Sequence, residues 1–317
     1  MNNSLNEDSH VTLLINSNLA ITLNDRENFK VYTLKEWNLL VTRLRNSNLK
    51  SPKAFFHSTC NDWKINLGLA DYEVERLKGL LNNRLQLTTE LERLSSRGIW
   101  ITTRAESTYP ALLKSRLKQK CPRFLFCAGN YDLLKTKGIG IVGSRDIDQE
   151  ALDFTKILSR RCTCDGYTIV SGGAKGVDSV AQSIALQNGG AVICIVSDSM
   201  AFKIRIKENS EFIMKNKLLF VSLFNPEITF KAYNALERNK YIYVLSQFTV
   251  AVSSDFNKGG TWSGSSENLK NNWVPLLVRK EQNIPIGNNE LLRIGALPLK
   301  REQIKNNNIP IGNWVNN

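Results

Sequence analysis

From about residue 138 onwards, short and continuously apolar runs alternate with stretches that are long enough to form helices. The runs lie at residues 139–142, 168–170, 191–196, 218–221, 249–252 and 274–278. Strands that alternate with helices form parallel sheets, and strands without polar alternation are typical of sheets covered by helices on both faces. This part of the chain is therefore predicted to form an α/β fold with a mostly parallel sheet.

The first hundred residues show helical spacing instead. Thr33-Leu-Lys-Glu36 has the sequence of a capping box, and the apolar residues that follow it recur as on one face of a helix. These residues are Trp37, Leu40, Val41 and Leu44. Asp71 is the expected cap of another helix, with an apolar stripe at Val74, Leu77, Leu80 and Leu81. Such stripes are typical of a core, so we predict a small helical domain at residues 1–95.

The pattern changes near Gly98, where a short β-type run begins, and we expect residues 96–282 to form the α/β domain. Residues 283–317 carry a repeat, Asn283-Ile-Pro-Ile-Gly-Asn288 and Asn308-Ile-Pro-Ile-Gly-Asn313. Proline and glycine interrupt both copies, which argues against helices there. We therefore predict a short C-terminal surface extension, in which the repeat is a turn or packing element.

Three glycine-rich segments follow strand-like runs. In the first, Gly138-Ile-Gly-Ile-Val-Gly-Ser-Arg145, a strand turns into a helix. Free backbone N–H groups and the positive helix end make such a junction an anion site, and Arg145 is suited to a bidentate contact with a phosphate. The glycines lie largely within the strand, and no acidic residue closes a following strand, which argues against a nicotinamide-binding fingerprint.

The second and third segments have the same design. In Val170-Ser-Gly-Gly-Ala-Lys-Gly-Val-Asp178, Lys175 is placed to meet a negative charge, and Asp178 either caps the next helix or contacts a ribose or base. In Asn257-Lys-Gly-Gly-Thr-Trp-Ser-Gly-Ser-Ser-Glu267, Trp262 either stacks on a base or packs in the core. Parallel strands share one carboxyl edge, where open α/β sheets bind ligands. The three segments are therefore expected to line one crevice.

The charge of the chain favours a polyanionic partner. Lys and Arg number 42 against 29 Asp and Glu, which gives a formal net charge of +13. Such a surface attracts nucleic acid through counterion release, although a merely basic surface would have the same composition.

Other features of the composition exclude classes of protein. The 6 cysteines are scattered, and Cys162-Thr-Cys164 has no second pair at zinc-finger spacing, so we predict neither a disulfide scaffold nor a metal site, and no cofactor. No apolar run approaches the ~18–20 residues that cross a bilayer. The N-terminus lacks the basic and apolar regions of a signal peptide. We expect a cytoplasmic protein without a membrane segment.

Several segments together resemble the DprA/Smf family of DNA-processing proteins, which bind single-stranded DNA and load a RecA-type recombinase. They occur in the order of the family and cover about residues 90–280. The segments are Tyr109-Pro-Ala-Leu-Leu113, Cys121-Pro-Arg-Phe-Leu125, Ile141-Val-Gly-Ser-Arg145, Val170–Asp178 and Glu237-Arg-Asn-Lys240. The resemblance implies an extended Rossmann-like fold, often preceded by a small helical domain, and a homodimer.

Carried over residue by residue, the resemblance also implies a pocket that binds the phosphates of nucleic acid. Its residues are Gly143, Ser144, Arg145, Ser171, Gly172, Lys175, Arg238, Asn239 and Lys240, and the third glycine-rich segment adds Lys258, Gly259, Gly260 and Thr261. This sequence departs from the family at Gln182, where a histidine is usual, and at Gly259–Gly264, which replaces a Ser-Gly-Ser loop. It also shows no winged-helix module after residue 280, so recombinase loading transfers less directly than DNA binding.

We therefore predict a non-enzymatic protein that binds single-stranded DNA in recombination, transformation or defence against foreign DNA. The alternative is a nucleotide-sensing or nucleotide-hydrolysing relative from the wider superfamily. In a hydrolase of that kind, Glu267 is the candidate general acid, although the glycine and threonine before it are out of register with the loop of those enzymes. A third hypothesis is a scaffold of the same fold that recognises a protein partner.

Overall fold

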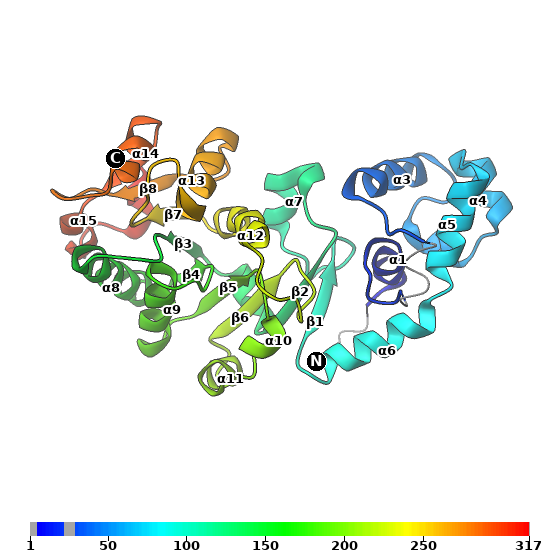
Figure 1. Ribbon diagram of the computed structural model, residues 1–317, viewed down its shortest axis with the longest axis horizontal. Coiled ribbons are helices and arrows are strands. Elements are labelled where there is room, and N and C mark those ends of the chain that lie inside the picture. Colours follow the sequence, from blue (N-terminus) through cyan, green and yellow to red (C-terminus); the bar gives the residue numbers. More distant parts are fainter. Residues whose placement is uncertain (1–4, 22–28, 317) are drawn as a thin grey trace. The chain divides into compact units, whose positions relative to one another are not determined.

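The computed structural model describes residues 5–21 and 29–316. The chain divides into two compact units, Met1–Leu125 and Phe126–Asn317 (Figure 1). The boundaries at residues 95 and 282 that the sequence suggested stay a prediction.

Helices dominate the first unit, as predicted. They are α1 (Glu7–Asn16), α3 (Leu34–Asn46), α4 (Cys60–Leu67), α5 (Asp71–Leu81), α6 (Arg84–Ser95) and α7 (Ala111–Leu117), with 3-10 turns at Pro52–Phe56 and Lys118–Lys120 and strand β1 at Trp100–Thr103. The capping box is present, because the Thr33 hydroxyl accepts a hydrogen bond from the Glu36 amide and Glu36 accepts one from the Thr33 amide. The expected cap at Asp71 is wrong: Asp71 is the first residue of α5 and pairs with Lys64 at 2.6 Å.

Glu36 also accepts a hydrogen bond from Arg76 at 2.8 Å, which, with the bonds from Thr33, lowers its pKa to about 2. A carboxylate whose pKa is depressed by folding stabilises the fold above its ordinary pKa of 4.5, and that stability is lost as the pH falls towards 2. Glu36→Gln is expected to lower the free energy of unfolding by only about 1 kcal/mol at pH 7, because the group is partly exposed and screened.

Urea unfolding followed by circular dichroism measures this loss. The gap between Glu36→Gln and the wild type should narrow between pH 4.5 and 2. Glu75→Gln, a change of an exposed glutamate on α5, is the control. A gap of the same size at every pH would contradict the assignment.

The second unit is the predicted α/β fold. Its strands are β2 (Phe124–Gly129), β3 (Gly138–Val142), β4 (Thr168–Ser171), β5 (Val192–Val196), β6 (Leu218–Ser222), β7 (Phe248–Ala251), β8 (Leu276–Arg279) and β9 (Leu297–Leu299). They pair in the order β2-β6-β5-β4-β3-β7-β8-β9, with β2 antiparallel to β6 and the other pairs parallel. The order from β5 to β9 is the 3-2-1-4-5-6 order of doubly wound nucleotide-binding folds. Every residue of β3, β5 and β6 is buried, which explains the continuous apolar runs.

Helices cover both faces of this sheet (Figure 1). They are α8 (Gln149–Cys164), α9 (Val177–Gln187), α10 (Met200–Lys203), α11 (Lys207–Met214), α12 (Ala232–Val244), α13 (Gly259–Asn271), α14 (Ile286–Arg293) and α15 (Arg301–Lys305), with 3-10 turns at Tyr131–Lys135 and Ile311–Val315. Helices α8 and α9 pack against each other, as do α12 and α13. The chain passes from β6 through α12 to β7 on the far side of β3, so the winding of the sheet reverses between β3 and β7.

The tail differs from the expectation of a non-helical surface extension. Each copy of the repeat begins a helical turn, with Pro285 preceding α14 and Pro310 preceding the last 3-10 turn. Proline fits there because its missing N–H would have no partner at a helix start. The buried Arg161 donates to three carbonyl groups of the tail, and Trp314 is 1% exposed. The tail is therefore packed into the second unit.

Within the described ranges 5–21 and 29–316, none of the helices combines the length and the apolarity that crossing a membrane would require.

Candidate functional site

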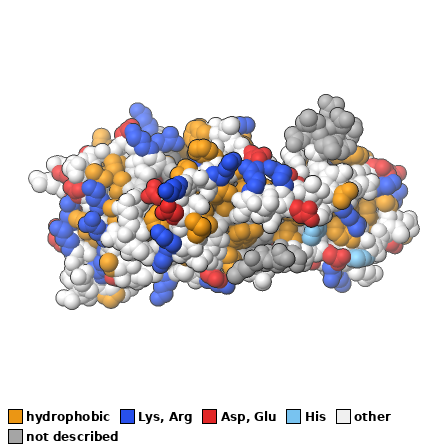
Figure 2. Space-filling model, turned by 90° about the horizontal axis from the view of Figure 1, so that it is seen from below, with side chains coloured by type: hydrophobic (Ala, Val, Ile, Leu, Met, Phe, Trp, Pro, Cys, Tyr) orange, Lys and Arg blue, Asp and Glu red, His pale blue; other side chains and the backbone are white. Residues whose placement is uncertain are grey.

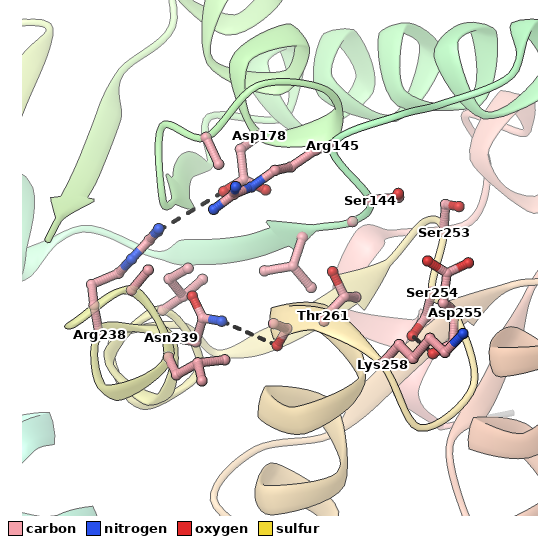
Figure 3. Close-up of a pocket in the computed structure, with 18 of the residues that line it drawn as sticks. Ser144, Arg145, Asp178, Arg238, Asn239, Ser253, Ser254, Asp255, Lys258 and Thr261 are labelled. Atoms are coloured by element: carbon pink, nitrogen blue, oxygen red, sulfur yellow. Dashed lines mark hydrogen bonds and ion pairs between the residues drawn. The ribbon is translucent and has the colours of Figure 1, made fainter. Parts of the chain in front are cut away.

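A pocket of ≈ 470 Å³ lies at the carboxyl ends of β3 and β7, where the winding of the sheet reverses. Its walls are the loop after β3, the loop after β7, one side of α12 and the amino end of α13 (Figure 3). Ligands bind at this place in open α/β sheets. Of the residues predicted from sequence, the pocket is lined by Gly143, Ser144, Arg145, Arg238, Asn239, Lys258, Gly259, Gly260 and Thr261.

Backbone hydrogen bonds join the loop after β3 to the loop after β7 and to the start of α9. The Ser144 amide donates to the Ser253 carbonyl group at 2.9 Å, and the Val177 amide donates to the Ser144 carbonyl group at 3.2 Å. The N–H group of Ser144 is thus already used within the fold. An anion in the pocket must find its backbone donors elsewhere.

The amino end of α13 offers such donors. The expected glycine loop at Gly259–Gly264 is wrong, because these residues form the first turns of α13. Their small size lets α13 approach α12, where a Cβ atom on Gly260 would overlap the amide of Asn239. No side chain caps this end of the helix, so the N–H groups of its first turn and its positive dipole face the pocket.

Arg238 of α12 is the most buried cation of the pocket wall, at 5% exposure. Its Nη1 lies 3.9 Å from Oδ2 of Asp178, which also accepts a hydrogen bond from the Gly172 amide at 3.0 Å. Burial raises the pKa of Asp178, against the lowering effect of Arg238, and burial lowers the pKa of Arg238. Asp178 does not cap α9, whose N-cap is Gly176. Instead it is the counter-ion of Arg238.

The ion pair leaves Arg238 incompletely bonded. Its Nε and Nη1 atoms find no hydrogen-bond acceptor among the residues that the structure describes. A buried donor without an acceptor costs about 1–3 kcal/mol, and more when it is charged. An anion that displaced the atoms covering these nitrogens and contacted them would remove this cost, so Arg238 is the residue of the wall from which a ligand is inferred.

The other predicted residues lie outside the lining. Ser171 holds β4 to β3 by donating to the Ile141 carbonyl group, and Gly172 makes room for Arg238, whose guanidinium group occupies the space of a Cβ atom at that position. Lys175 is mostly exposed, and its Nζ lies 3.4 Å from Oδ1 of Asp146. Lys240 pairs with Glu237 on α12.

The structure also places Glu267, the candidate general acid, and Trp262, the candidate stacking residue. Glu267 is exposed on α13 and is not among the residues of the pocket wall. Trp262 packs edge to face against Phe256, with ring centroids 4.9 Å apart. In the described part of the chain, no cluster of His, Cys, Asp and Glu could hold a metal ion.

The charge of the wall is balanced rather than uniformly basic. Three cations (Arg145, Arg238 and Lys258) stand beside three carboxylates (Asp146, Asp178 and Asp255). On the face seen in Figure 2, Lys and Arg side chains are likewise scattered among Asp and Glu. Affinity for an anion must therefore come from particular donors, above all Arg238 and the amino end of α13, and not from a general positive field.

Sequence reasoning missed the wall formed by Ser253, Ser254 and Asp255. These polar residues follow the buried run at 249–252 directly, and this position at the end of a strand was the available signal. It also missed Phe230, which lines the pocket before α12 and lies under the guanidinium group of Arg145 at 5.6 Å.

Comparison with known proteins identifies relatives of this chain. The curated DNA processing protein DprA of Streptococcus pneumoniae is 28% identical over 139 residues, 44% of this chain and 49% of that protein. DprA of Bacillus subtilis is 27% identical over 177 residues, 55% of this chain and 59% of that protein. The chain thus spans about half the length of the curated relatives that it matches.

Solved structures extend the likeness. The X-ray structure of DprA from Streptococcus pneumoniae has a TM-score of 0.65 and 19% identity over 95% of this chain and 97% of its own, which shows a shared fold. A structure of DNA processing protein A from Helicobacter pylori, described for its single-stranded DNA binding mode, has a TM-score of 0.53 and 27% identity, covering 69% of this chain and 94% of its own.

The family model described as DNA recombination-mediator protein A matches residues 100–307, a range that contains every strand from β2 to β9 and the whole pocket. Because the match covers more than half of the chain, this protein belongs to the DNA recombination-mediator protein A family.

Proposed function

We propose that this protein binds single-stranded DNA and acts without catalysis in DNA processing, in recombination, transformation or defence against foreign DNA. The observation that carries the proposal is the buried Arg238. Its Nε and Nη1 atoms find no hydrogen-bond acceptor among the described residues, and its side chain lines a pocket in the nucleotide-binding position of the fold. The Helicobacter pylori relative, described as binding single-stranded DNA, and the net charge of +13 support DNA as the ligand.

In this proposal a backbone phosphate enters between Arg238 and the amino end of α13. Figure 3 shows Arg238 and Asn239 at one end of the pocket and Lys258, with Ser254 and Asp255, at the other. Arg145 and Lys258 are exposed and would contact the phosphate from the rim. Phosphate contacts do not distinguish bases, so binding should be independent of sequence.

Two protein partners belong to the same proposal. The family description, recombination mediator, supports a RecA-type recombinase as a partner, and the resemblance to the family supports a homodimer. Co-sedimentation with a recombinase and measurement of the mass in solution test these two partners separately from DNA binding.

Arg145→Ala is expected to weaken binding of a ~20-nucleotide single strand roughly tenfold, because it removes one charge-assisted contact to phosphate. It should also reduce the slope of log affinity against log salt by about one. Fluorescence anisotropy across a salt series measures both quantities. Arg160→Ala removes the same charge from an exposed position near the other end of α8 and should change neither. Equal effects of the two variants, or a flat salt response in the wild type, would refute the phosphate site.

The nucleotide-handling alternative is favoured by the size of the pocket, since ≈ 470 Å³ lies in the range of small-molecule sites. Competition decides between the two hypotheses. Tight binding of a mononucleotide that single-stranded DNA cannot displace would replace our proposal with nucleotide sensing. Turnover of that nucleotide, abolished by Glu267→Gln, would make the protein a hydrolase.

A further inference from the structure

A group of basic side chains lies in the first unit, where α7 passes into the 3-10 turn at Lys118–Lys120. Lys114, Lys118 and Lys120 are exposed, and Lys114 and Lys118 are one helical turn apart. Burial raises the pKa of the Cys121 thiol, and the half-buried Arg104 and Lys114 both lie close enough to oppose this rise. We call Arg104, Lys114, Lys118 and Lys120 the basic patch.

Asn38 of α3 joins the two parts of the patch. Its Nδ2 donates to the Gln119 carbonyl group at 2.9 Å, and its Oδ1 accepts from Nη1 of Arg104 at 3.1 Å. Arg104 also donates to the Pro122 carbonyl group at 3.2 Å. Because both acceptors are neutral, neither compensates the charge of Arg104. These bonds fix Arg104 beside the lysines of the 3-10 turn.

Carboxylates do not balance the patch as they balance the pocket. The sequence has no Asp or Glu between Glu106 and Asp132, and Glu106 itself accepts hydrogen bonds from Asn6 and Ser9. Within the described ranges 5–21 and 29–316, no ion pair joins a lysine of the patch to a carboxylate. A surface of one sign of charge attracts a polyanion.

The patch lacks the exposed rings that surfaces for single strands use to stack bases. Tyr109, whose ring centroid lies 5.5 Å from the Lys114 ammonium group, is only 3% exposed. No aromatic side chain of residues 100–125, all of which the structure describes, is exposed. Cations without rings fit a duplex, because its bases are turned inward and its phosphates are about twice as dense along the axis as those of one strand.

We propose that the basic patch binds the phosphate backbone of duplex DNA, as a second site that is separate from the pocket. None of its residues lines the pocket, so the proposal does not depend on the proposed function. The contacts are made to phosphate alone, and duplex binding is therefore independent of base sequence. Single strand and duplex are held by different residues.

The test is fluorescence anisotropy of a labelled ~20-base-pair duplex DNA and of a ~20-nucleotide single strand across a salt series. Lys118→Gln combined with Lys120→Gln is expected to lower the affinity for the duplex about tenfold and to reduce the slope of log affinity against log salt by about two, because two phosphate contacts are lost. The affinity for the single strand should not change. Arg145→Ala should give the opposite pattern.

Lys50→Gln combined with Lys78→Gln is the matched control. It removes the same two charges from exposed positions elsewhere in the first unit, the second of them on α5. It should leave both affinities at the wild-type values. Circular dichroism of each double variant verifies folding before binding is compared.

The other outcomes are distinct. If the wild type does not bind the duplex, or if the two double variants act alike, the proposal is overturned. If the patch variant weakens strand and duplex equally, the patch is a general phosphate surface and its role as a duplex site is overturned. Patch-dependent binding to phosphatidylglycerol vesicles without duplex binding replaces the duplex with a membrane surface. If the duplex binds through the patch but the strand does not bind, only the proposed function fails.

Discussion

Arg238→Met is expected to lower the affinity for single-stranded DNA by at least a hundredfold and to destabilise the protein by about 3–5 kcal/mol. Both effects have one origin, since Arg238 supplies the buried donors of the pocket and is the counter-ion of the buried Asp178. Without the arginine, the carboxylate at 178 is left buried and unpaired. The loss in affinity follows from removing a guanidinium group that can contact phosphate with two N–H groups.

A second substitution separates the two effects. Arg238→Met with Asp178→Asn removes the unpaired charge, and the new amide oxygen can still accept the hydrogen bond from the Gly172 amide. The double variant should regain most of the lost stability, measured by urea unfolding, yet still fail to bind the strand. Recovery of DNA binding together with stability would show that Arg238 is only a structural residue.

The stability of Arg238→Met should also depend on pH in a defined direction. Burial already raises the pKa of Asp178, and losing Arg238 removes the effect that opposes this rise. A carboxyl group whose pKa is raised by folding binds its proton more tightly in the folded state, so stability falls as the pH rises from its ordinary pKa of 3.8 to the raised value. The deficit of the single variant relative to the wild type should therefore shrink as the pH is lowered towards 3.8.

The sheet could be predicted from the sequence because burial on both faces leaves an unbroken apolar signal. The runs at 139–142 and 168–170 match β3 and β4 to within a residue at each end. The antiparallel pairing of β2 with β6 was not predictable, because it depends on how distant segments meet. The strand β9 was not predicted for another reason, because it is three residues long and contains a proline.

In the helix α13, tertiary packing outweighs the low helix propensity of glycine. Glycine is among the poorest helix formers, so the segment at Gly259–Gly264 was expected to be a loop. In the structure those glycines allow close contact with Asn239 and Tyr243 of α12, and this packing outweighs the low propensity. No single-sequence rule could supply this contact, since it joins residues about twenty positions apart.

The sequence showed which segments form the pocket but not what each of their side chains does there. All three glycine-rich segments and Arg238 do meet at one pocket, the second segment through Ala174 and Asp178, as the shared carboxyl edge of parallel strands requires. Whether a side chain at such an edge points into the pocket or away from it depends on tertiary contacts. Lys175 points towards Asp146 at the surface, whereas Asp178 turns inward to Arg238.

Asn288→Ala is expected to destabilise the second unit by about 2–4 kcal/mol, because it removes a buried amide that satisfies several backbone groups at once. Asn288 is fully buried; its side chain accepts from the Ser254 amide at 2.8 Å and donates to the carbonyl groups of Val252 and Arg279. The preceding Gly287 makes this possible, since a Cβ atom there would overlap the Ser254 carbonyl group. The first copy of the repeat thus holds the loop that forms one wall of the pocket.

The second copy of the repeat provides the control within the same chain. Asn313 occupies the equivalent place in the motif but is exposed, so Asn313→Ala should change stability by no more than about 0.5 kcal/mol. Urea unfolding of the two variants gives the comparison, and anisotropy at a temperature where both are folded measures DNA binding. Because Ser254 and Asp255 lie in the pocket wall, only Asn288→Ala should also weaken binding. Equal stability losses would mean that the repeat serves general packing, whereas a difference ties its first copy to the geometry of the pocket.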